Sequence, residues 1–111
     1  MEGGLVKALR YHILLALAEA PLHGAEIRRR AEEQSGGVVR LYPATLYGTL
    51  DDLQGSGWIE QIEPHDAAPD QTRWRFYGLT RDGRRALEEE TTRLERVLTL
   101  ARAALREAPG Q

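Results

Sequence analysis

The sequence predicts a mainly α-helical chain with one small β-hairpin, and three observations support this. Apolar residues recur at helical spacing in three segments between residues 5 and 55. Two short segments between residues 58 and 79 alternate in the manner of paired strands. A last helical segment, over residues 81 to about 107, carries an apolar stripe that a single helix cannot bury alone.

The first helix is expected over residues 5–20, which are rich in leucine and alanine. Its apolar residues include Val6, Leu9 and Ile13 and surround most of the helix, a pattern typical of burial on several sides. Pro21 should end this helix, because a proline disfavours the helical conformation of the residue before it.

Two shorter helices should follow. An amphipathic helix is expected over residues 25–34, after a turn at residues 23–24, and the Ser-Gly-Gly sequence of residues 35–37 should stop it. A third helix should begin at Pro43, whose fixed φ and missing N–H suit the first helical turn, and should end at residues 55–57. Its buried stripe is predicted to consist of Leu46, Leu50 and Leu53.

The hairpin is expected next. Residues 58–62 and 73–79 are predicted to form its two strands, joined by a long polar loop over residues 63–72. Thr80 then suits the N-cap of the last helix, because its hydroxyl can accept hydrogen bonds from first-turn amides.

The last helix is predicted to make a dimer. At a rise of about 1.5 Å per residue it spans roughly 40 Å and should project beyond the rest of the chain. Its apolar residues recur like the seam of a coiled coil, which indicates that a second copy of the chain covers them. The predicted interface residues are Leu87, Leu94, Val97, Leu98, Ala101 and Leu105.

Three helices followed by a hairpin make a winged helix-turn-helix, whose third helix enters the major groove of DNA. Arg73 and Arg75 should share one face of the hairpin and reach phosphates or the minor groove, with Trp74 and Phe76 directed towards the core. The predicted DNA-binding residues are Arg28, Ala44, Thr45, Tyr47, Gly48, Thr49, Arg73 and Arg75. The expected organisation is a DNA-binding domain at residues 1–79, a dimerisation helix at residues 80–107 and a disordered tail at residues 108–111.

Plainer roles stay open for some of these residues. Arg28 can instead pair with Glu32, one helical turn away. Thr45 and Thr49 can simply be polar, solvent-exposed residues of a surface helix, and Tyr47 can pack on the wing.

Composition limits the function classes. The net charge of −2 means that any DNA binding depends on where the positive charges lie, not on their number. The absence of cysteine excludes disulfides and thiolate metal sites. His12, His23 and His65 lie in different predicted elements and no catalytic motif occurs, so we expect neither an enzyme nor a metal or cofactor. No signal or membrane-spanning pattern is visible, so a cytoplasmic location is expected.

Five segments carry a family resemblance in their order and spacing: residues 14–18, 21–27, 42–50, 57–60 and 73–83. With them, residues 12 to about 88 resemble the PadR family of bacterial winged-helix transcription regulators, in its short subfamily. The resemblance implies a homodimeric transcriptional repressor that binds double-stranded DNA. It implies that the C-terminal helix makes the dimer. It also implies a small-molecule effector, of unknown identity, at or near the dimer interface.

Three features depart from the family pattern. Ala25 stands where the family often has a tyrosine, and Tyr42 stands where a small capping residue is common. Asp51 and Asp52 replace residues that are commonly basic. These acids should weaken phosphate binding, so we expect modest affinity with a steep salt dependence, carried mainly by the wing.

Two alternatives stay open. The net charge and the two aspartates are compatible with a winged-helix protein-interaction module that does not bind specific DNA. Trp58 and Trp74 could flank a flat ligand at a dimer pore, but tryptophans in a hairpin more often pack the core, and we favour the core.

Overall fold

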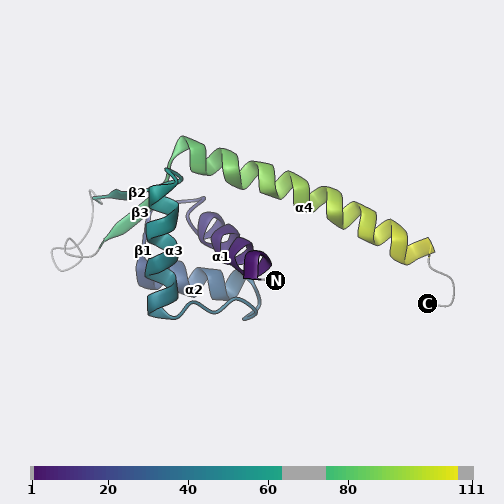
Figure 1. Cartoon of the computed structure of the whole chain (residues 1–111), viewed down its shortest axis with the longest axis horizontal. Helices are drawn as coiled ribbons and strands as arrows, with labels where there is room; N and C mark the ends of the chain where they lie inside the picture. Colours follow the sequence, from purple (N-terminus) through teal and green to yellow (C-terminus); the bar gives the residue numbers. More distant parts are fainter. Residues whose placement is uncertain (1, 64–74, 108–111) are drawn as a thin grey trace.

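The computed structural model describes residues 2–63 and 75–107, with side chains from residue 7 onwards, and has the predicted mainly helical fold with a small sheet (Figure 1). The predicted tail at residues 108–111 and the wing residues Arg73 and Trp74 lie outside the described part. The elements are α1 (Glu2–Ala16), β1 (Leu22–His23), α2 (Gly24–Gln34), α3 (Pro43–Gly55), β2 (Ile59–Ile62), β3 (Phe76–Leu79) and α4 (Arg81–Glu107).

The core lies among α1, α2, α3 and the sheet. The three leucines predicted to face inward from α3 are all buried, with Leu50 and Leu53 fully enclosed. α2 contributes Ile27 and Ala31 to the same cluster, at the helical spacing that the amphipathic pattern predicts. The predicted inward face of α3 is therefore confirmed, whereas in α2 the apolar Ala25 is exposed.

The sheet has three strands, in the order β1-β3-β2, where the sequence predicted two. His23, predicted to lie in a turn, and Leu22 before it pair antiparallel with Phe76 and Tyr77 of β3. A two-residue strand has no alternation to detect, and its pairing depends on a strand more than 50 residues away. β2 and β3 form the expected antiparallel pair.

The strand faces differ from the prediction in one respect. Tyr77 is the β3 residue that enters the core, at 2% exposure. Phe76 lies on the opposite face of the sheet, where its ring meets that of His23 edge-on at 5.5 Å. The prediction that Phe76 points to the core is therefore wrong. Phe76 and Tyr77 are both large aromatic residues on opposite faces of this strand, so the residue types alone do not tell which one faces the core.

α1 ends at Ala16, four residues before the predicted end. The chain then makes a tighter turn than an α-helix, in which the amide of Ala18 donates to the carbonyl of Leu15, three residues earlier, at 3.1 Å. Arg84 of α4 donates to the carbonyl of Ala18 at 3.1 Å, so it satisfies a carbonyl beyond the end of α1.

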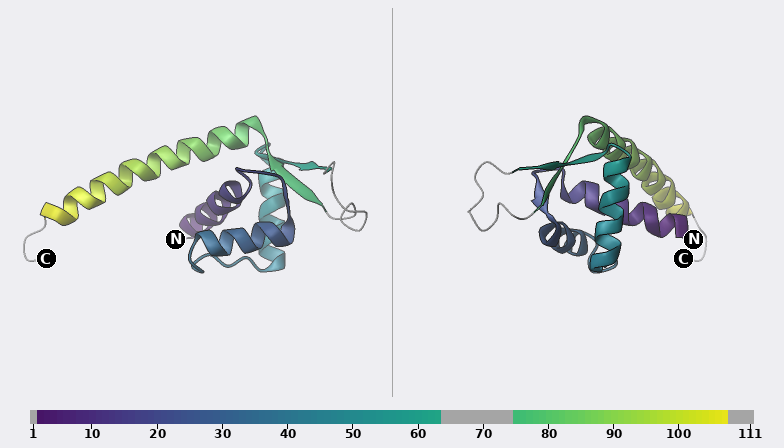
Figure 2. Two further views of the ribbon diagram at one scale, coloured as in Figure 1. Left: turned by 180° about the vertical axis from the view of Figure 1, so that it is seen from behind. Right: turned by 60° about the vertical axis from the view of Figure 1, so that its left-hand side comes forward.

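α4 has the predicted bounds and the predicted cap. The Thr80 hydroxyl accepts from the amide of Gly83 at 3.0 Å and donates to the carbonyl of Gly57 at 2.6 Å. Further along, Tyr11 of α1 and Thr91 of α4 share a hydrogen bond of 3.0 Å between their hydroxyls. Beyond this contact α4 extends away from the other elements, as Figures 1 and 2 show, and the molecule measures 61 × 26 × 25 Å.

Candidate nucleic-acid interface

The outer face of α3 carries the side chains predicted to meet DNA. Ala44, Thr45 and Gly48 are exposed, as the inward position of the leucines requires. All three residues are small, so a groove wall can approach the helix closely at these positions. Thr49 is half-buried, and its hydroxyl donates to the carbonyl of Thr45 at 2.8 Å, so this proton is used within the helix.

Tyr47 lies at the flank of α3 and leans on the start of α2. It is 48% exposed. A Cβ atom added at Gly24 would lie 2.6 Å from the Tyr47 hydroxyl oxygen, so the phenol would have to move if residue 24 carried a side chain. Gly24 therefore leaves room for Tyr47 in its present position. This role of Gly24 was not predicted, because Tyr47 is far from it in the sequence.

The wing approaches the same place. Arg75, one residue before β3, is exposed and lines a hollow together with Tyr47 and the first residues of α2. α3 and the wing thus offer an arginine and a phenol on one side of the molecule. Arg73, the second predicted wing arginine, lies outside the described residues.

The arginines of α2 are held in ion pairs. The Arg28 Nε lies 3.4 Å from a carboxylate oxygen of Glu32, as the plainer of its two roles predicts. Arg29 donates to Glu33 at 2.7 Å and also pairs with Glu26, and the hydrogen bond from Arg29 holds the pKa of Glu26 below its ordinary value. An exposed pair such as Arg28–Glu32 contributes at most about 1 kcal/mol, so a phosphate can displace Glu32 from Arg28.

The exposed apolar stripe of α4 is present beyond the Tyr11–Thr91 contact. Leu94 is 38% exposed and Leu105 is 67% exposed, and the other predicted interface residues past Leu87 are exposed as well: Val97, Leu98 and Ala101. Leu87 differs, because it is 7% exposed and belongs to the core of its own subunit. Leu100, 64% exposed, was not predicted, although it lies at the edge of the same stripe.

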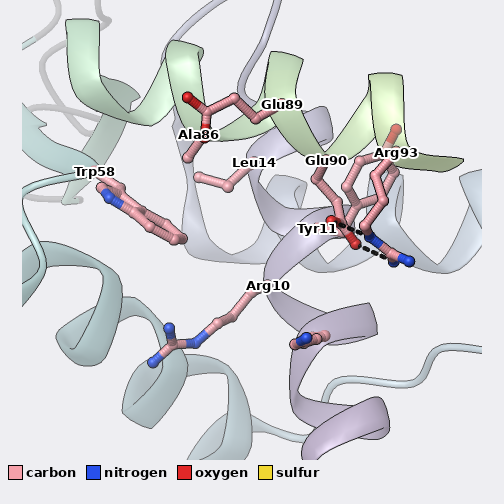
Figure 3. Close-up of a pocket in the computed structure, with 9 residues that line it drawn as sticks. Arg10, Tyr11, Leu14, Trp58, Ala86, Glu89, Glu90 and Arg93 are labelled. Atoms are coloured by element: carbon pink, nitrogen blue, oxygen red, sulfur yellow. Dashed lines mark hydrogen bonds and ion pairs between the residues drawn. The ribbon is translucent and has the colours of Figure 1, made fainter.

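A hollow of about 440 Å³ lies between α1, α4 and Trp58. Trp58 stands at one end and the ion pair of Glu90 with Arg93 at the other, with Leu14 between them (Figure 3). Tyr11 also lines the hollow. The hydrogen bond from Arg93 keeps the pKa of Glu90 below its ordinary value, so this carboxylate stays charged. Trp58 also packs against the core, as favoured from the sequence, while Trp74 lies outside the described residues.

Among residues 2–63 and 75–107, no three histidine, cysteine or acidic side chains come together in a way that could hold a metal ion. Within the same ranges, no helix is long and apolar enough to cross a membrane.

Known proteins share this architecture. A PadR-like transcriptional regulator from Bacillus cereus matches with a TM-score of 0.78 at 21% identity, over 96% of this chain and 99% of that one. A transcriptional regulator from Clostridium thermocellum matches with a TM-score of 0.72 at 18% identity, over 93% and 95% of the two chains. PadR of Bacillus subtilis, solved in complex with operator DNA, matches with a TM-score of 0.62 at 24% identity, over 75% of this chain and 46% of that one. These likenesses establish the fold.

Sequence comparison gives the family. An uncharacterized 37.1 kDa transposon protein of Streptomyces fradiae is 36% identical over 85 residues, which are 77% of this chain. The match covers 22% of that protein, so the chain spans about a fifth of its relative's length. Residues 13–89, more than half of the chain, match the transcriptional regulator PadR-like family. The chain therefore belongs to the PadR-like family of transcriptional regulators.

Proposed function

We propose that this protein is a homodimeric, sequence-specific DNA-binding repressor that places α3 in the major groove and the wing on the DNA backbone. The observation that carries the proposal is the shared hollow of Tyr47 on α3 and Arg75 on the wing. Because these two elements face the same side, one DNA duplex can contact both. The exposed, small side chains at the start of α3 support close approach to base edges.

The exposed stripe of α4 supports the dimer. Two copies joined along this helix would present two α3 helices about 34 Å apart, one turn of DNA, to a pseudo-palindromic operator. Such a dimer would repress by excluding polymerase from the site it covers. The hollow beside Trp58 is where we place a small effector, because its lining combines aromatic and apolar surface with charged groups at its rim.

The test is a selection of duplexes from a random DNA library, followed by titration of the selected duplex at several salt concentrations. We expect a pseudo-palindromic consensus and an affinity that falls steeply as salt rises. A library that yields no enriched duplex, with binding that does not depend on salt, would favour the protein-interaction module instead.

Arg75→Ala should weaken binding to every duplex and should lower the salt slope by about one, because one phosphate contact is lost. The matched control is Arg96→Ala, which removes an exposed arginine from α4. Titration of both variants on the selected and on a scrambled duplex checks this. An Arg75→Ala slope equal to that of the control variant would remove the wing from the interface.

Asp51→Asn should tighten binding roughly fivefold at low salt, because a charge at a few ångströms in water is worth about 1 kcal/mol. Asp51 is exposed on the outer side of α3, where it would repel phosphates. The gain should shrink as salt rises, since exposed charges are screened. Glu107→Gln, at the far end of α4, changes the net charge equally and should leave the affinity unchanged. Equal affinities of the two variants would place Asp51 away from DNA.

A further inference from the structure

A second hollow, of about 470 Å³, opens where the wing meets the two helices of the helix-turn-helix. Three separate parts of the chain contribute to it. β1 and the first turn of α2 supply His23, Gly24 and Ala25, α3 supplies Tyr47, and the residue before β3 supplies Arg75. No carboxylate lies among these lining residues. The hollow is therefore lined by hydrogen-bond donors from parts of the chain that are far apart in sequence.

Gly24 leaves the space in which the Tyr47 hydroxyl lies. A Cβ atom at position 24 would come within 2.6 Å of the hydroxyl oxygen and 3.1 Å of the ring carbon that bears it. The phenol thus occupies the space that a side chain at the start of α2 would fill. Its hydroxyl lies beside the start of α2, at the wall of the hollow.

The chemistry of this hollow fits a phosphate group. Arg75 offers several N–H donors, which suit the oxygens of a phosphate, and Tyr47 offers an O–H donor. The first N–H groups of a helix have no acceptor within the helix and carry partial positive charge, which adds to the same preference. The acidic residue of this turn, Glu26, is turned to its ion pairs with Arg29 and Arg30.

We propose that this hollow is a seat for one phosphodiester of the DNA backbone, bound jointly by Arg75 and Tyr47, with Gly24 as the positioning residue that makes room for the phenol. The proposal rests on the proposed function and adds the group of DNA that is recognised. A single phosphate gripped by α3 and by the wing fixes the register of the duplex on both elements. The contributions of the two side chains should therefore depend on one another.

The test uses the selected duplex with single phosphates replaced, one at a time, by neutral methylphosphonates. With the wild-type protein, one position per half-site should weaken binding far more than its neighbours. Tyr47→Phe should raise Kd about tenfold on the unmodified duplex, the loss expected for a hydrogen bond to a charged group. On the duplex modified at that one position, Tyr47→Phe should raise Kd much less than on the unmodified duplex, because the phosphate that accepts its hydrogen bond has already lost its charge.

Two controls accompany it. Thr99→Val removes a hydroxyl of α4 that donates to the carbonyl of Glu95 at 3.0 Å, far from the hollow, and it should leave Kd unchanged. Gly24→Ala should raise Kd about as much as Tyr47→Phe, and it should add little in the Tyr47→Phe background, because its effect is exerted through the phenol.

The outcomes separate the seat from the proposed function. If the wild-type protein selects a duplex but Tyr47→Phe binds it normally, or if the loss is the same at every modified phosphate, the seat is wrong and the regulator stands. If the wild-type protein selects no duplex at all, both proposals are overturned.

Discussion

Replacement of Gly83 by alanine should destabilise the fold by about 3 kcal/mol or more, at the upper end of what an added methyl costs in a packed site. A Cβ atom at position 83 would lie 2.8 Å from the carbonyl carbon of Trp58 and closer still to its oxygen. Both partners are backbone, so neither can rotate away as a side chain would. The same Trp58 carbonyl accepts from the amide of Thr80 at 3.1 Å, and the Thr80 hydroxyl caps Gly83. The methyl group therefore disturbs the junction at which α4 leaves the domain.

Thermal unfolding at one fixed protein concentration measures this effect, because Tm depends on concentration if the protein dimerises. We expect a fall in Tm of roughly 10 °C or more for a domain of this size. Gly48→Ala is the matched control, since Gly48 lies within α3 and a Cβ there meets nothing within 4 Å. It should leave the protein equally stable or up to about 1 kcal/mol more stable, as alanine favours a helix over glycine. A Gly83→Ala protein as stable as this control would mean that the start of α4 can shift freely.

Local sequence patterns correctly predicted those features of the fold that depend on residues close together in the sequence. The spacing of Leu46, Leu50 and Leu53 fixed the inward face of α3 and, by difference, the exposed positions of Thr45 and Gly48. The bounds of α4 and its cap at Thr80 followed from an uninterrupted helical stripe after a suitable capping residue. Helical periodicity and capping act within a few residues, so one sequence suffices to read them.

Contacts between distant segments could not be read in the same way. The pairing of β1 with β3 joins residues more than 50 positions apart. The choice of Tyr77 over Phe76 as the core residue depends on what packs against each face of the strand. Gly24 was read only as part of a turn, because its meaning depends on the Tyr47 side chain, which arrives from another helix.

The same distinction holds for the candidate site: single residues were predicted from the sequence, but their proximity was not. The sequence pointed to Tyr47 and Arg75 separately, whereas their shared hollow is a property of the folded chain. Leu87 shows the opposite error, since it fits the stripe of α4 yet packs into the core of its own subunit. Periodicity identifies an apolar face but does not tell whether the same chain or a second copy covers it.

Leu94→Glu should convert the protein from dimer to monomer and weaken dimerisation at least about 100-fold. A carboxylate that must leave water at an apolar seam costs several kcal/mol unless it finds a partner, and about 2.7 kcal/mol already corresponds to 100-fold. Leu94 lines a hollow with Tyr11, Glu90 and Arg93 where α4 leaves α1, so a second subunit packing there would enclose it. Glu90 lies one turn earlier on α4, and a second acid four residues along adds like-charge repulsion.

Sedimentation at micromolar concentration measures the oligomeric state, and circular dichroism checks that the helices remain. Thr92→Glu introduces the same charge about 200° around α4 from Leu94, at an exposed position, and should leave the dimer intact. The monomer should still bind a single half-site. It should do so far more weakly than the dimer binds the full operator, because the linked second half-site is lost. If Leu94→Glu and Thr92→Glu sediment alike as dimers, the stripe of α4 is not the seam, and the spacing of the two α3 helices must be set by another surface.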